Sequence, residues 1–316
     1  LYGGFSGTES TLAQRRYITN ETILDGNIGT AGNNTDNSYH VLTAINCTAT
    51  IDGFTIRNGN ANGTSFTPFG TNSVPQNGGG GILLSGCTST IENNILKNNV
   101  GTEGAGISCR NGTGTIAKNI FSANLSSQRG GGCAGVNSSL TLANNLFVQN
   151  RGTTGGGAIG LSNVVVNTAG NTFYQNLAPG GDGGALWLFN GSGQFSNNIF
   201  WQNSSNALTD IAGADYYRVP GTANNYVFSN NLLQLPAGLY STSATGSNNL
   251  GTTATGNIFS TNPIFFMPAT PAGNDAVWRT DDDGLIPEAC SSAYNTGNNS
   301  LIPAGQTSDV MGLPRI

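Results

Sequence analysis

The sequence is poor in charged side chains. Only 9% of its 316 residues are Asp, Glu, Lys or Arg, against about a quarter in ordinary soluble domains. Lys and Arg together number 11, dispersed along a chain of net charge −5. Such a chain lacks the dense positive surface that a phosphate backbone requires, so we expect no nucleic-acid partner.

Long apolar runs are also missing. No run approaches the roughly 20 residues of a membrane-spanning helix, so we expect no direct membrane insertion. The chain opens at Leu1 without the basic and then apolar pattern of a signal segment. We therefore expect one module excised from a larger polypeptide, with other modules of that polypeptide as partners.

Histidine and cysteine are scarce. The one histidine, His40, lies in a β-prone run, where we expect a structural role rather than a role as the general base that activates a catalytic nucleophile. The cysteines are odd in number and contain no C-x-x-C pair, which gives little support to a zinc site: Cys47, Cys87, Cys109, Cys133 and Cys290. Two alternatives stay open for them, buried small residues or one bridge between neighbouring repeats.

Glycine and asparagine, in contrast, are abundant and periodic. A large apolar residue recurs every 25 to 27 residues from Leu96 to Phe200, with an asparagine two positions before it. The asparagine series is Asn94, Asn119, Asn145, Asn171, Asn198, Asn231 and Asn257. A period this regular indicates a stacked repeat architecture.

The composition decides which kind of stack to expect. Glycine at this density costs roughly 1 kcal/mol per residue in a helix, which excludes helical repeats. Three short β-prone runs per repeat predict a right-handed parallel β-helix of roughly eight coils. We expect a single domain, with an N-terminal cap over 1–20, coils over 21–262 and a C-terminal cap segment over 263–316.

Stacking predicts how the repeated residues are used. Each asparagine of the series should occupy a left-handed bend and join an amide ladder from coil to coil. A second asparagine, three positions after the apolar residue, recurs at Asn99, Asn124, Asn150, Asn176, Asn203 and Asn262. Between the two asparagines, an aromatic stack is expected from Phe121, Phe147, Phe173 and Phe200.

Two insertions interrupt the period and are the candidate binding loops. They fall at 60–78 and 204–225, where we single out Phe66, Phe69, Asp210, Asp215, Tyr216 and Tyr217. The alternative is surface decoration without a function.

The densest acidic cluster is a candidate metal site. Asp281, Asp282 and Asp283, followed by Gly284, could hold one Ca²⁺ through carboxylate and carbonyl oxygens. The alternative is a turn with hydrogen-bonded Asp side chains. We expect no other cofactor.

The chain resembles the secreted bacterial right-handed parallel β-helix proteins, Bacteroidota-type surface modules related to the polymorphic outer-membrane protein repeats. The matching stretches lie from end to end of the chain and include LYGGFSGTE at 1–9, IDGFTIRNG at 51–59, WRTDDDGLIP at 278–287 and DVMGLPRI at 309–316. The resemblance implies an extracellular or cell-surface location, and its members include adhesins, cell-wall proteins and sugar-acting enzymes.

Candidate catalytic groups are sparse, so we expect a non-catalytic structural or adhesive module that contacts a polysaccharide or a surface protein. The alternative is a carbohydrate-active enzyme. A lyase would need calcium and a base, yet Lys97 and Lys118 stand apart from the acids. A glycoside hydrolase would need a pair of carboxylates, and none is apparent in the coils. Repeated Thr-x-Thr ranks that could order water are not expected from Thr48, Thr88, Thr113 and Thr141.

Overall fold

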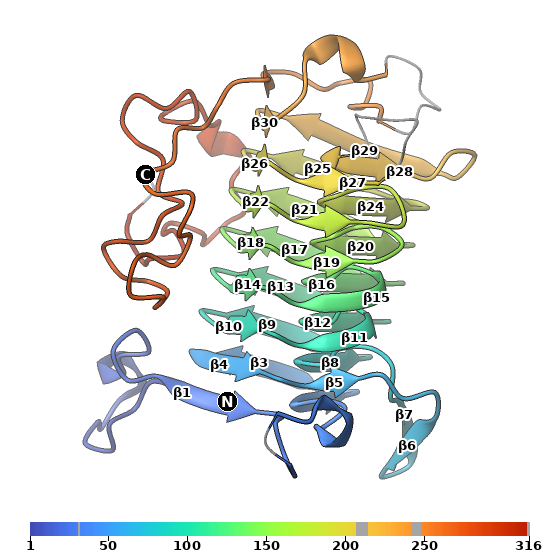
Figure 1. Cartoon of the computed structure of the whole chain (residues 1–316), viewed down its shortest axis with the longest axis vertical. Coiled ribbons are helices and arrows are strands. Elements are labelled where there is room, and N and C mark those ends of the chain that lie inside the picture. The colour runs from blue at the N-terminus through green and yellow to red at the C-terminus, as the bar shows by residue number, and fades with distance from the viewer. Residues whose placement is uncertain (31, 207–213, 242–247, 315–316) are drawn as a thin grey trace.

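The chain folds into an all-β parallel solenoid. In the computed structural model, which describes residues 1–30, 32–206, 214–241 and 248–314, the backbone winds through four sheets and stacks coil upon coil (Figure 1). The solenoid expected from the repeat is thereby confirmed. Its six-stranded sheet corresponds to about six turns, fewer than the roughly eight coils predicted.

Each sheet takes one strand from successive coils. Sheet 1 consists of β1 (Thr22–Asp25), β4 (Phe54–Arg57), β10 (Ile95–Lys97), β14 (Ile120–Ser122), β18 (Leu146–Val148), β22 (Thr172–Tyr174), β26 (Ile199–Trp201), β30 (Leu232–Leu233) and β31 (Ile258–Phe259). Sheet 2 consists of β5 (Asn60–Ala61), β11 (Val100–Glu103), β15 (Leu125–Arg129), β19 (Arg151–Gly152), β23 (Leu177–Ala178) and β27 (Ser204–Ser205).

The other two sheets close each coil. Sheet 3 consists of β2 (Leu42–Ile45), β8 (Ile82–Ser85), β12 (Ile107–Arg110), β16 (Cys133–Val136), β20 (Ile159–Ser162), β24 (Leu186–Phe189) and β28 (Tyr216–Arg218). Sheet 4 consists of β3 (Thr48–Asp52), β9 (Thr88–Glu92), β13 (Thr113–Ala117), β17 (Ser139–Ala143), β21 (Val165–Ala169), β25 (Gly191–Ser196) and β29 (Asn224–Ser229).

One coil therefore has four short strands rather than the three expected. The additional strand is that of sheet 2, for example β11, which is paired in parallel with β5 and β15. Glycine, serine and threonine give these segments a weak β pattern, and the backbone partner in the next coil defines them as strands.

The corners between the sheets rely on left-handed residues. Asparagine, glutamine or glycine occupies most of them, as at Asn144 (φ 56°) and Gln149 (φ 54°) on the two sides of β18. The left-handed residue is the one before the ladder asparagine, not the ladder asparagine itself as we expected. Gly156 (φ 57°) supplies the corner between sheets 2 and 3, where its missing side chain avoids the Ile159 carbonyl.

The predicted asparagine ladder is present and buried. Asn145 is representative: its Nδ2 donates to Asn171 Oδ1 (2.9 Å) and to the Ile116 carbonyl (2.7 Å). Its Oδ1 accepts from the backbone N and the Nδ2 of Asn119. The same hydrogen-bonding scheme links Asn94, Asn119, Asn145, Asn171, Asn198, Asn231 and Asn257.

A second ladder runs along the other end of the sheet 1 strands. It links Asn99, Asn124, Asn150, Asn176 and Asn203. In the next coil Gln234 replaces asparagine, exchanging hydrogen bonds with the backbone of Asn203. Asn262, which the spacing placed in this series, lies outside the ladder and caps the backbone N of Ile264.

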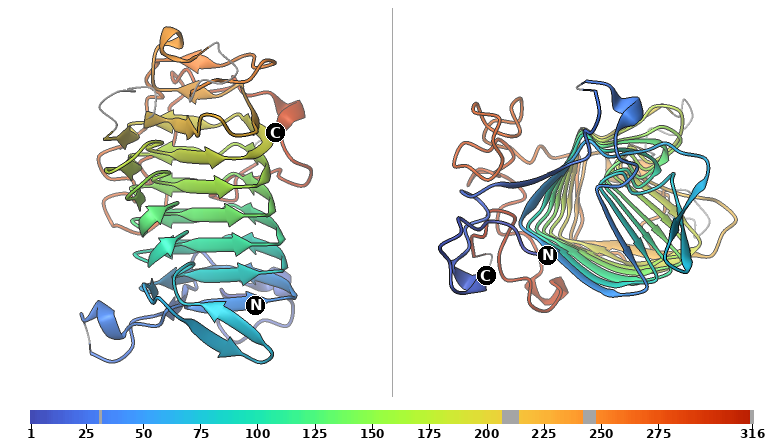
Figure 2. Two further views of the ribbon diagram at one scale, coloured as in Figure 1. Left: turned by 90° about the vertical axis from the view of Figure 1, so that its right-hand side faces the viewer. Right: turned by 90° about the horizontal axis from the view of Figure 1, so that it is seen from below.

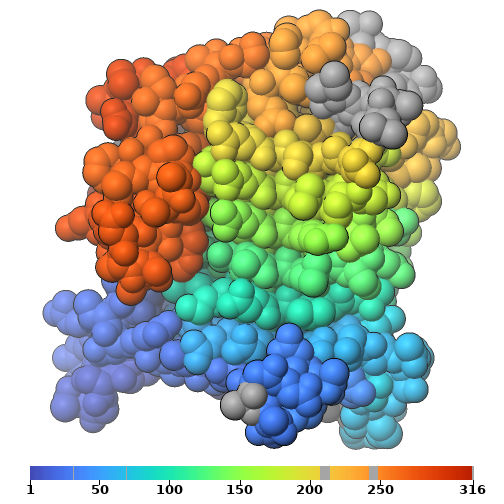
Figure 3. All heavy atoms as spheres, in the orientation of Figure 1, coloured from blue at the N-terminus to red at the C-terminus, as the bar shows by residue number. Residues whose placement is uncertain are grey.

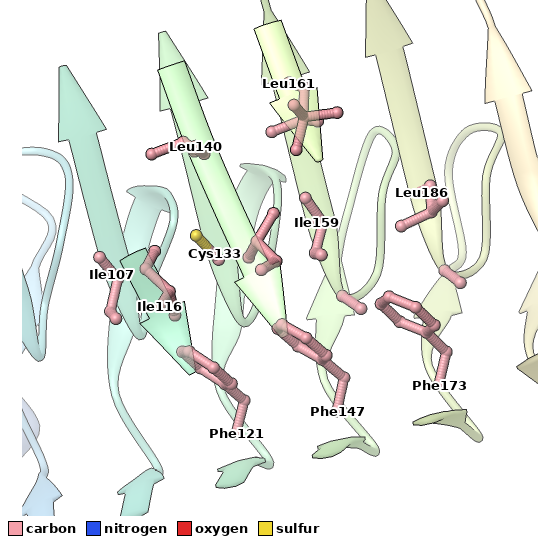
Figure 4. Packing of buried hydrophobic residues seen from close by; sticks show 14 of the residues in the cluster. Ile107, Ile116, Phe121, Cys133, Leu140, Phe147, Ile159, Leu161, Phe173 and Leu186 are labelled. Atoms are coloured by element: carbon pink, nitrogen blue, oxygen red, sulfur yellow. The ribbon is translucent and has the colours of Figure 1, made fainter. Parts of the chain in front are cut away.

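Between the two ladders, the middle residue of each three-residue strand of sheet 1, from β10 to β26, points into the solenoid. The rings of Phe121, Phe147, Phe173 and Phe200 stack with centroids 4.5, 5.0 and 4.7 Å apart, as predicted. Figure 4 shows the first three of these rings. Seen along the axis, the coils superpose (Figure 2). The inward side chains of sheet 1 pack with those of the other sheets in one buried core.

The regions flanking the coils are less regular. The N-terminal segment contains η1 (Leu12–Gln14) and η2 (Asn34–Asp36), and Tyr2 forms a bridge with Asp52 of β3. The first insertion forms an antiparallel hairpin of β6 (Phe66–Phe69) and β7 (Asn72–Pro75). Beyond β29 the described elements are β30, η4 (Ala237–Leu239), β31 and η5 (Asn299–Leu301).

The C-terminal segment, residues 260–314, lies along the side of the solenoid. It turns back from the last coil and covers the outer face of sheet 1 (Figures 1 and 3). This position differs from the expected cap over 263–316. The outer face of sheet 1 is apolar and would otherwise be exposed, which explains why the segment packs there.

Candidate binding cleft

The C-terminal segment docks on sheet 1 through an apolar cluster. Ile120, Leu146, Val148 and Tyr174 of the sheet pack with residues of the segment, namely Phe265, Trp278 and Leu285. The Tyr174 ring meets Phe265 edge-on, with centroids 5.9 Å apart, and its hydroxyl donates to the Pro268 carbonyl (3.1 Å). These contacts arise because the outer positions of the short sheet 1 strands carry large apolar residues.

Corner asparagines add polar contacts to the same interface. Asn144 Nδ2 donates to the Ser308 carbonyl (2.8 Å). Asn197 donates to the Asn298 carbonyl (2.9 Å) and accepts from its backbone N (2.8 Å). Their left-handed backbone turns these side chains outward, and the C-terminal segment uses them as attachment points.

Arg279 is the central anchor of the segment. Its guanidinium is buried and donates to the carbonyls of Lys118 (3.0 Å) and Val310 (3.2 Å). It also lies 5.4 Å from the ring centroid of Tyr17, in the N-terminal segment. Burial lowers the pKa of Arg279 to about 10, which leaves it charged at neutral pH. One side chain therefore connects the N-terminal segment, the coils and the C-terminal segment.

A cleft of about 540 Å³ remains between sheet 1 and the C-terminal segment. Its solenoid side includes Asn144, Thr172 and Asn197, and its opposite wall includes Asp283 and Tyr294. The volume lies in the range of pockets that hold small ligands. Among the described residues that line the cleft none is Lys, Arg or His, and amides supply most of the polar groups.

Asp283 is the most perturbed group in the cleft. Only 6% of the residue is exposed, and Oδ2 accepts from the Arg279 backbone N (2.7 Å) while Oδ1 has no hydrogen-bond partner. Burial, together with the charges of Asp282 and Asp275, raises the pKa of Asp283 to about 6 against the opposing hydrogen bond from Arg279. A ligand hydroxyl or amide is the type of donor that Oδ1 lacks.

A second carboxylate also lines the cleft. Asp309 is half-buried, and its Oδ1 accepts from the backbone N of Met311 and of Leu313, both at 2.9 Å. Its carboxylate therefore closes a turn. The spacing of sequence motifs did not reveal this cleft, because one wall comes from the coils between residues 144 and 258 and the other from residues 271–311, which have no repeat pattern.

The insertion residues that we predicted to bind are placed very differently from one another. Phe66 projects from the hairpin with 64% of its surface exposed. The side chain of Phe69 and the whole of Asp210 lie outside the described part of the chain. Asp215 and Tyr216 are fully buried, which contradicts their expected display on a surface loop, and Tyr217 is half-buried.

Tyr216 is buried because β28 continues sheet 3. Its register partner is Leu186, an inward residue, and its ring stacks on Phe228 with centroids 4.0 Å apart. Asp215 accepts from the Tyr240 hydroxyl (2.6 Å) and the Gln234 backbone N (3.1 Å) through Oδ2, and Oδ1 has no partner. Burial raises the pKa of Asp215 to about 7.

The predicted calcium ligands do not converge. Asp282 accepts from Thr280 Oγ1 (2.7 Å) and the Asn274 backbone N (2.7 Å), Asp283 faces Arg279, and Asp281 is exposed. Within the described ranges no group of three or more His, Cys, Asp or Glu side chains is arranged to hold a metal ion. The arrangement matches the alternative of a turn with hydrogen-bonded Asp side chains.

The other candidate catalytic groups are occupied by structural contacts. Both ring nitrogens of His40 lie 3.0 Å from backbone carbonyls, those of Gly79 and Pro75, and burial lowers the pKa of this histidine. Six charged residues of the N-terminal segment and the first coils form three separate ion pairs: Arg15 with Asp52, Arg57 with Asp25, and Arg110 with Glu103.

The strand register of sheet 4 contradicts the expectation that the coils lack repeated Thr-x-Thr ranks. The strand register aligns Thr141 with Thr50 rather than with Thr48. Ranks of the Thr-x-Thr type therefore do occur on this face. From coil to coil they are Thr48 and Thr50, Thr88 and Thr90, Thr113 and Thr115, and then Ser139 and Thr141. The expectation failed because it compared threonines by their place in the repeat without the in-register pairing. Val165 ends the regular hydroxyl pattern in the next coil.

No helix in the described ranges is both long and apolar enough to span a membrane. Comparison of the chain with protein-family models, with curated proteins and with solved structures found no match. The solenoid, its ladders and the lateral cleft are therefore the basis for the functional proposal.

Proposed function

We propose that this protein is a non-catalytic extracellular or cell-surface module, a rigid solenoid that binds glycan in its lateral cleft. The observation that carries the proposal is the cleft's lining of amides, hydroxyls and one buried carboxylate with an open hydrogen-bond site. Sugars present alternating hydroxyl donors and acceptors, which such a lining can match without a net charge on the ligand.

The rigidity of the scaffold supports an adhesive role. The ladders and the aromatic stack fix one wall of the cleft, so little ordering of that wall accompanies binding. We propose further that the coils wind right-handed and that the ends of the stack are capped against edge pairing, Tyr2 beside β3 being one such contact. Other modules of a larger polypeptide would present the solenoid at the surface.

A glycan array followed by calorimetry on the best ligand tests the proposal. Thr172→Trp fills the cleft, and Thr90→Trp makes the same change on an outward strand position of sheet 4 as the control. We expect at least a tenfold loss of affinity for Thr172→Trp and less than a twofold change for Thr90→Trp. Absence of glycan binding, or equal losses in both variants, contradicts the proposal.

A glycoside hydrolase is the second candidate, and one observation favours it. Asp283 has a pKa raised to about 6, as general acids do, and Asp309 lines the same cleft. Release of reducing ends from a bound glycan, lost in Asp283→Asn with binding retained, would establish it. Binding without any release favours the non-catalytic module.

A further inference from the structure

Two cysteines face each other across the first two coils. Cys47 and Cys87 each follow the corner residue between sheets 3 and 4, which is Asn46 in one coil and Gly86 in the other. The pairing of Ile45 with Ser85 before them and of Thr48 with Thr88 after them places the two cysteines in register. Their Sγ atoms are 3.6 Å apart, and both are free thiols.

We propose that Cys47 and Cys87 form a disulfide that staples the first coil to the second when a disulfide oxidant is present. Adjacent parallel strands lie about 4.8 Å apart, within the range of Cα separations that disulfides span. Side-chain rotation can therefore bring the two sulfur atoms into bonding distance without a shift of strands. Equivalent corners of the next two coils carry Gly112 and Ser138, so the pair is confined to this end of the stack.

The difference in exposure assigns the order of attack. Cys47 is exposed, whereas only 2% of Cys87 is. The Cys47 thiolate attacks oxidised glutathione, which forms a mixed disulfide and releases one reduced glutathione. The Cys87 thiolate then attacks the Cys47 sulfur and expels the second glutathione. Two thiol protons pass to solvent or to the released thiolates, and the two electrons reduce the oxidant's disulfide.

The bridge would act at a weak point of the solenoid. β2 and β3, on either side of Cys47, are the outermost strands of their sheets, and beyond β3 the pairing continues as the short bridge between Tyr2 and Asp52. The bridge also closes the loop that carries the β6–β7 hairpin, which Asn46 already contacts through Nδ2 to Asn72 Oδ1 (3.1 Å). Closing this loop restricts the unfolded chain and holds the edge coil in place.

The environment of Cys47 predicts how the reaction depends on pH. Desolvation raises the pKa of Cys47, and its interaction with Cys87 raises it further. The thiolate fraction is therefore small at neutral pH, so formation of the bridge should accelerate as the solution becomes more alkaline.

Thiol counting on the intact protein tests the proposal. Reduced protein is incubated with oxidised glutathione at pH 8, denatured, and titrated for free thiols, and the disulfide is located by peptide mapping. We expect the five thiols to fall to three, with one Cys47–Cys87 cross-link and a reversible rise of several degrees in Tm. Cys290→Ser, which removes the other exposed thiol, should still form the bridge.

The outcomes that overturn the proposal are distinct. Cys47→Ser should lose no thiol pair and should show no oxidant-dependent rise in Tm. A wild-type protein that keeps all its thiols, that stops at glutathione on Cys47, or that forms only dimers through Cys290 contradicts the bridge. None of these results depends on whether the cleft binds glycan.

Discussion

In the coils from β10 to β26, each buried asparagine of the ladders meets its own equivalent in the next coil, whereas in the C-terminal segment each polar contact occurs once. Asn145 exchanges hydrogen bonds with Asn119 and Asn171, its counterparts on either side. Arg279 in the C-terminal segment has no counterpart and reaches three different backbone carbonyls.

This difference indicates that the repeated coils supply most of the stability, whereas the C-terminal segment completes the binding cleft. Repetition satisfies most ladder amides with one residue type, and it produces a stack in which a local change affects both neighbouring coils. The C-terminal segment contributes one wall of the cleft and depends on a few separate contacts. We therefore expect changes in the ladder to be far more damaging than changes at the interface.

The largest effect is expected from Asn145→Ala. The substitution removes four buried side-chain hydrogen bonds, namely those to the Ile116 carbonyl and Asn171 Oδ1 and those from the backbone N and Nδ2 of Asn119. Asn171 Oδ1 and Asn119 Nδ2 each keep one other partner, the backbone N of residue 145 and the Ile91 carbonyl. At about 1 kcal/mol for each lost hydrogen bond, and more for the groups left unsatisfied, the free energy of unfolding should fall by about 4 kcal/mol. Denaturant unfolding monitored by circular dichroism measures the loss.

Asn144→Gly is the matched control for this variant. Asn144 is adjacent in sequence but points outward, and the next coil carries Gly170 at the same left-handed corner. We expect a loss of about 1 kcal/mol from the hydrogen bond to the Ser308 carbonyl of the C-terminal segment. Equal losses in the two variants would remove the distinction between ladder and interface.

The next largest effect is expected in the pH dependence of stability, where a buried carboxyl group of the last coils and one of the C-terminal segment should titrate at different pH values. Asp215 in the last coils and Asp283 in the C-terminal segment have pKa values raised to about 7 and about 6. A raised folded-state pKa means that the folded protein holds its proton while the unfolded chain, with a pKa near 4, releases it. This stabilisation is complete below pH 4 and is lost as the pH rises to about 7.

For Asp215 alone the change should amount to about 4 kcal/mol between pH 4 and pH 7. Asp215→Asn should flatten this part of the stability profile and leave the part due to Asp283, which ends near pH 6. Urea unfolding at successive pH values measures both. An unchanged slope in Asp215→Asn would show that the carboxyl does not titrate as its burial predicts.

Arg279→Met should have an intermediate effect. It keeps much of the side-chain volume but leaves the carbonyls of Lys118 and Val310 without their donor and removes the cation beside Tyr17. We expect the C-terminal segment to loosen at a cost of about 2 kcal/mol, with faster limited proteolysis in residues 260–314. Cleavage within the coils at the same rate would argue against separate docking.

The smallest effect is expected in the exposed glutamine ladder. Gln175 Nε2 donates to Gln202 Oε1 (2.9 Å), and Gln175 Oε1 accepts from Gln149 (3.0 Å); Gln149 and Gln202 are exposed and Gln175 is half-buried. Gln175→Asn keeps a residue suited to the left-handed corner but shortens the side chain. Thermal unfolding should show a change within about 0.5 kcal/mol, because water replaces the lost partners.

Sequence reasoning worked where the structure repeats. The interval between Asn119 and Asn145 and the apolar residue inside it predict the ladder, the inward Phe stack and the solenoid together. It failed where the period breaks. The broken period predicts a surface loop at Tyr216, whereas the pairing of β28 with β24 aligns Tyr216 with the inward Leu186 and places it in the core.

The cleft could not be predicted from the repeat. Its position depends on how residues 260–314 fold back along sheet 1, and this segment has neither a period nor long strands. The one available signal is the run of apolar residues at the outer positions of sheet 1, such as Leu146 and Val148, which requires a cover without indicating which segment supplies it.

Amide hydrogen exchange in the wild-type protein and in Arg279→Met tests the central claim most directly, namely that a separately docked segment forms the wall of the cleft on a cooperative stack. We predict that amides of β10 to β26 exchange slowest in both proteins. In the variant, exchange in residues 260–314 should rise by at least about tenfold while the coil amides stay unchanged. A rise of the same size in both regions would contradict the account.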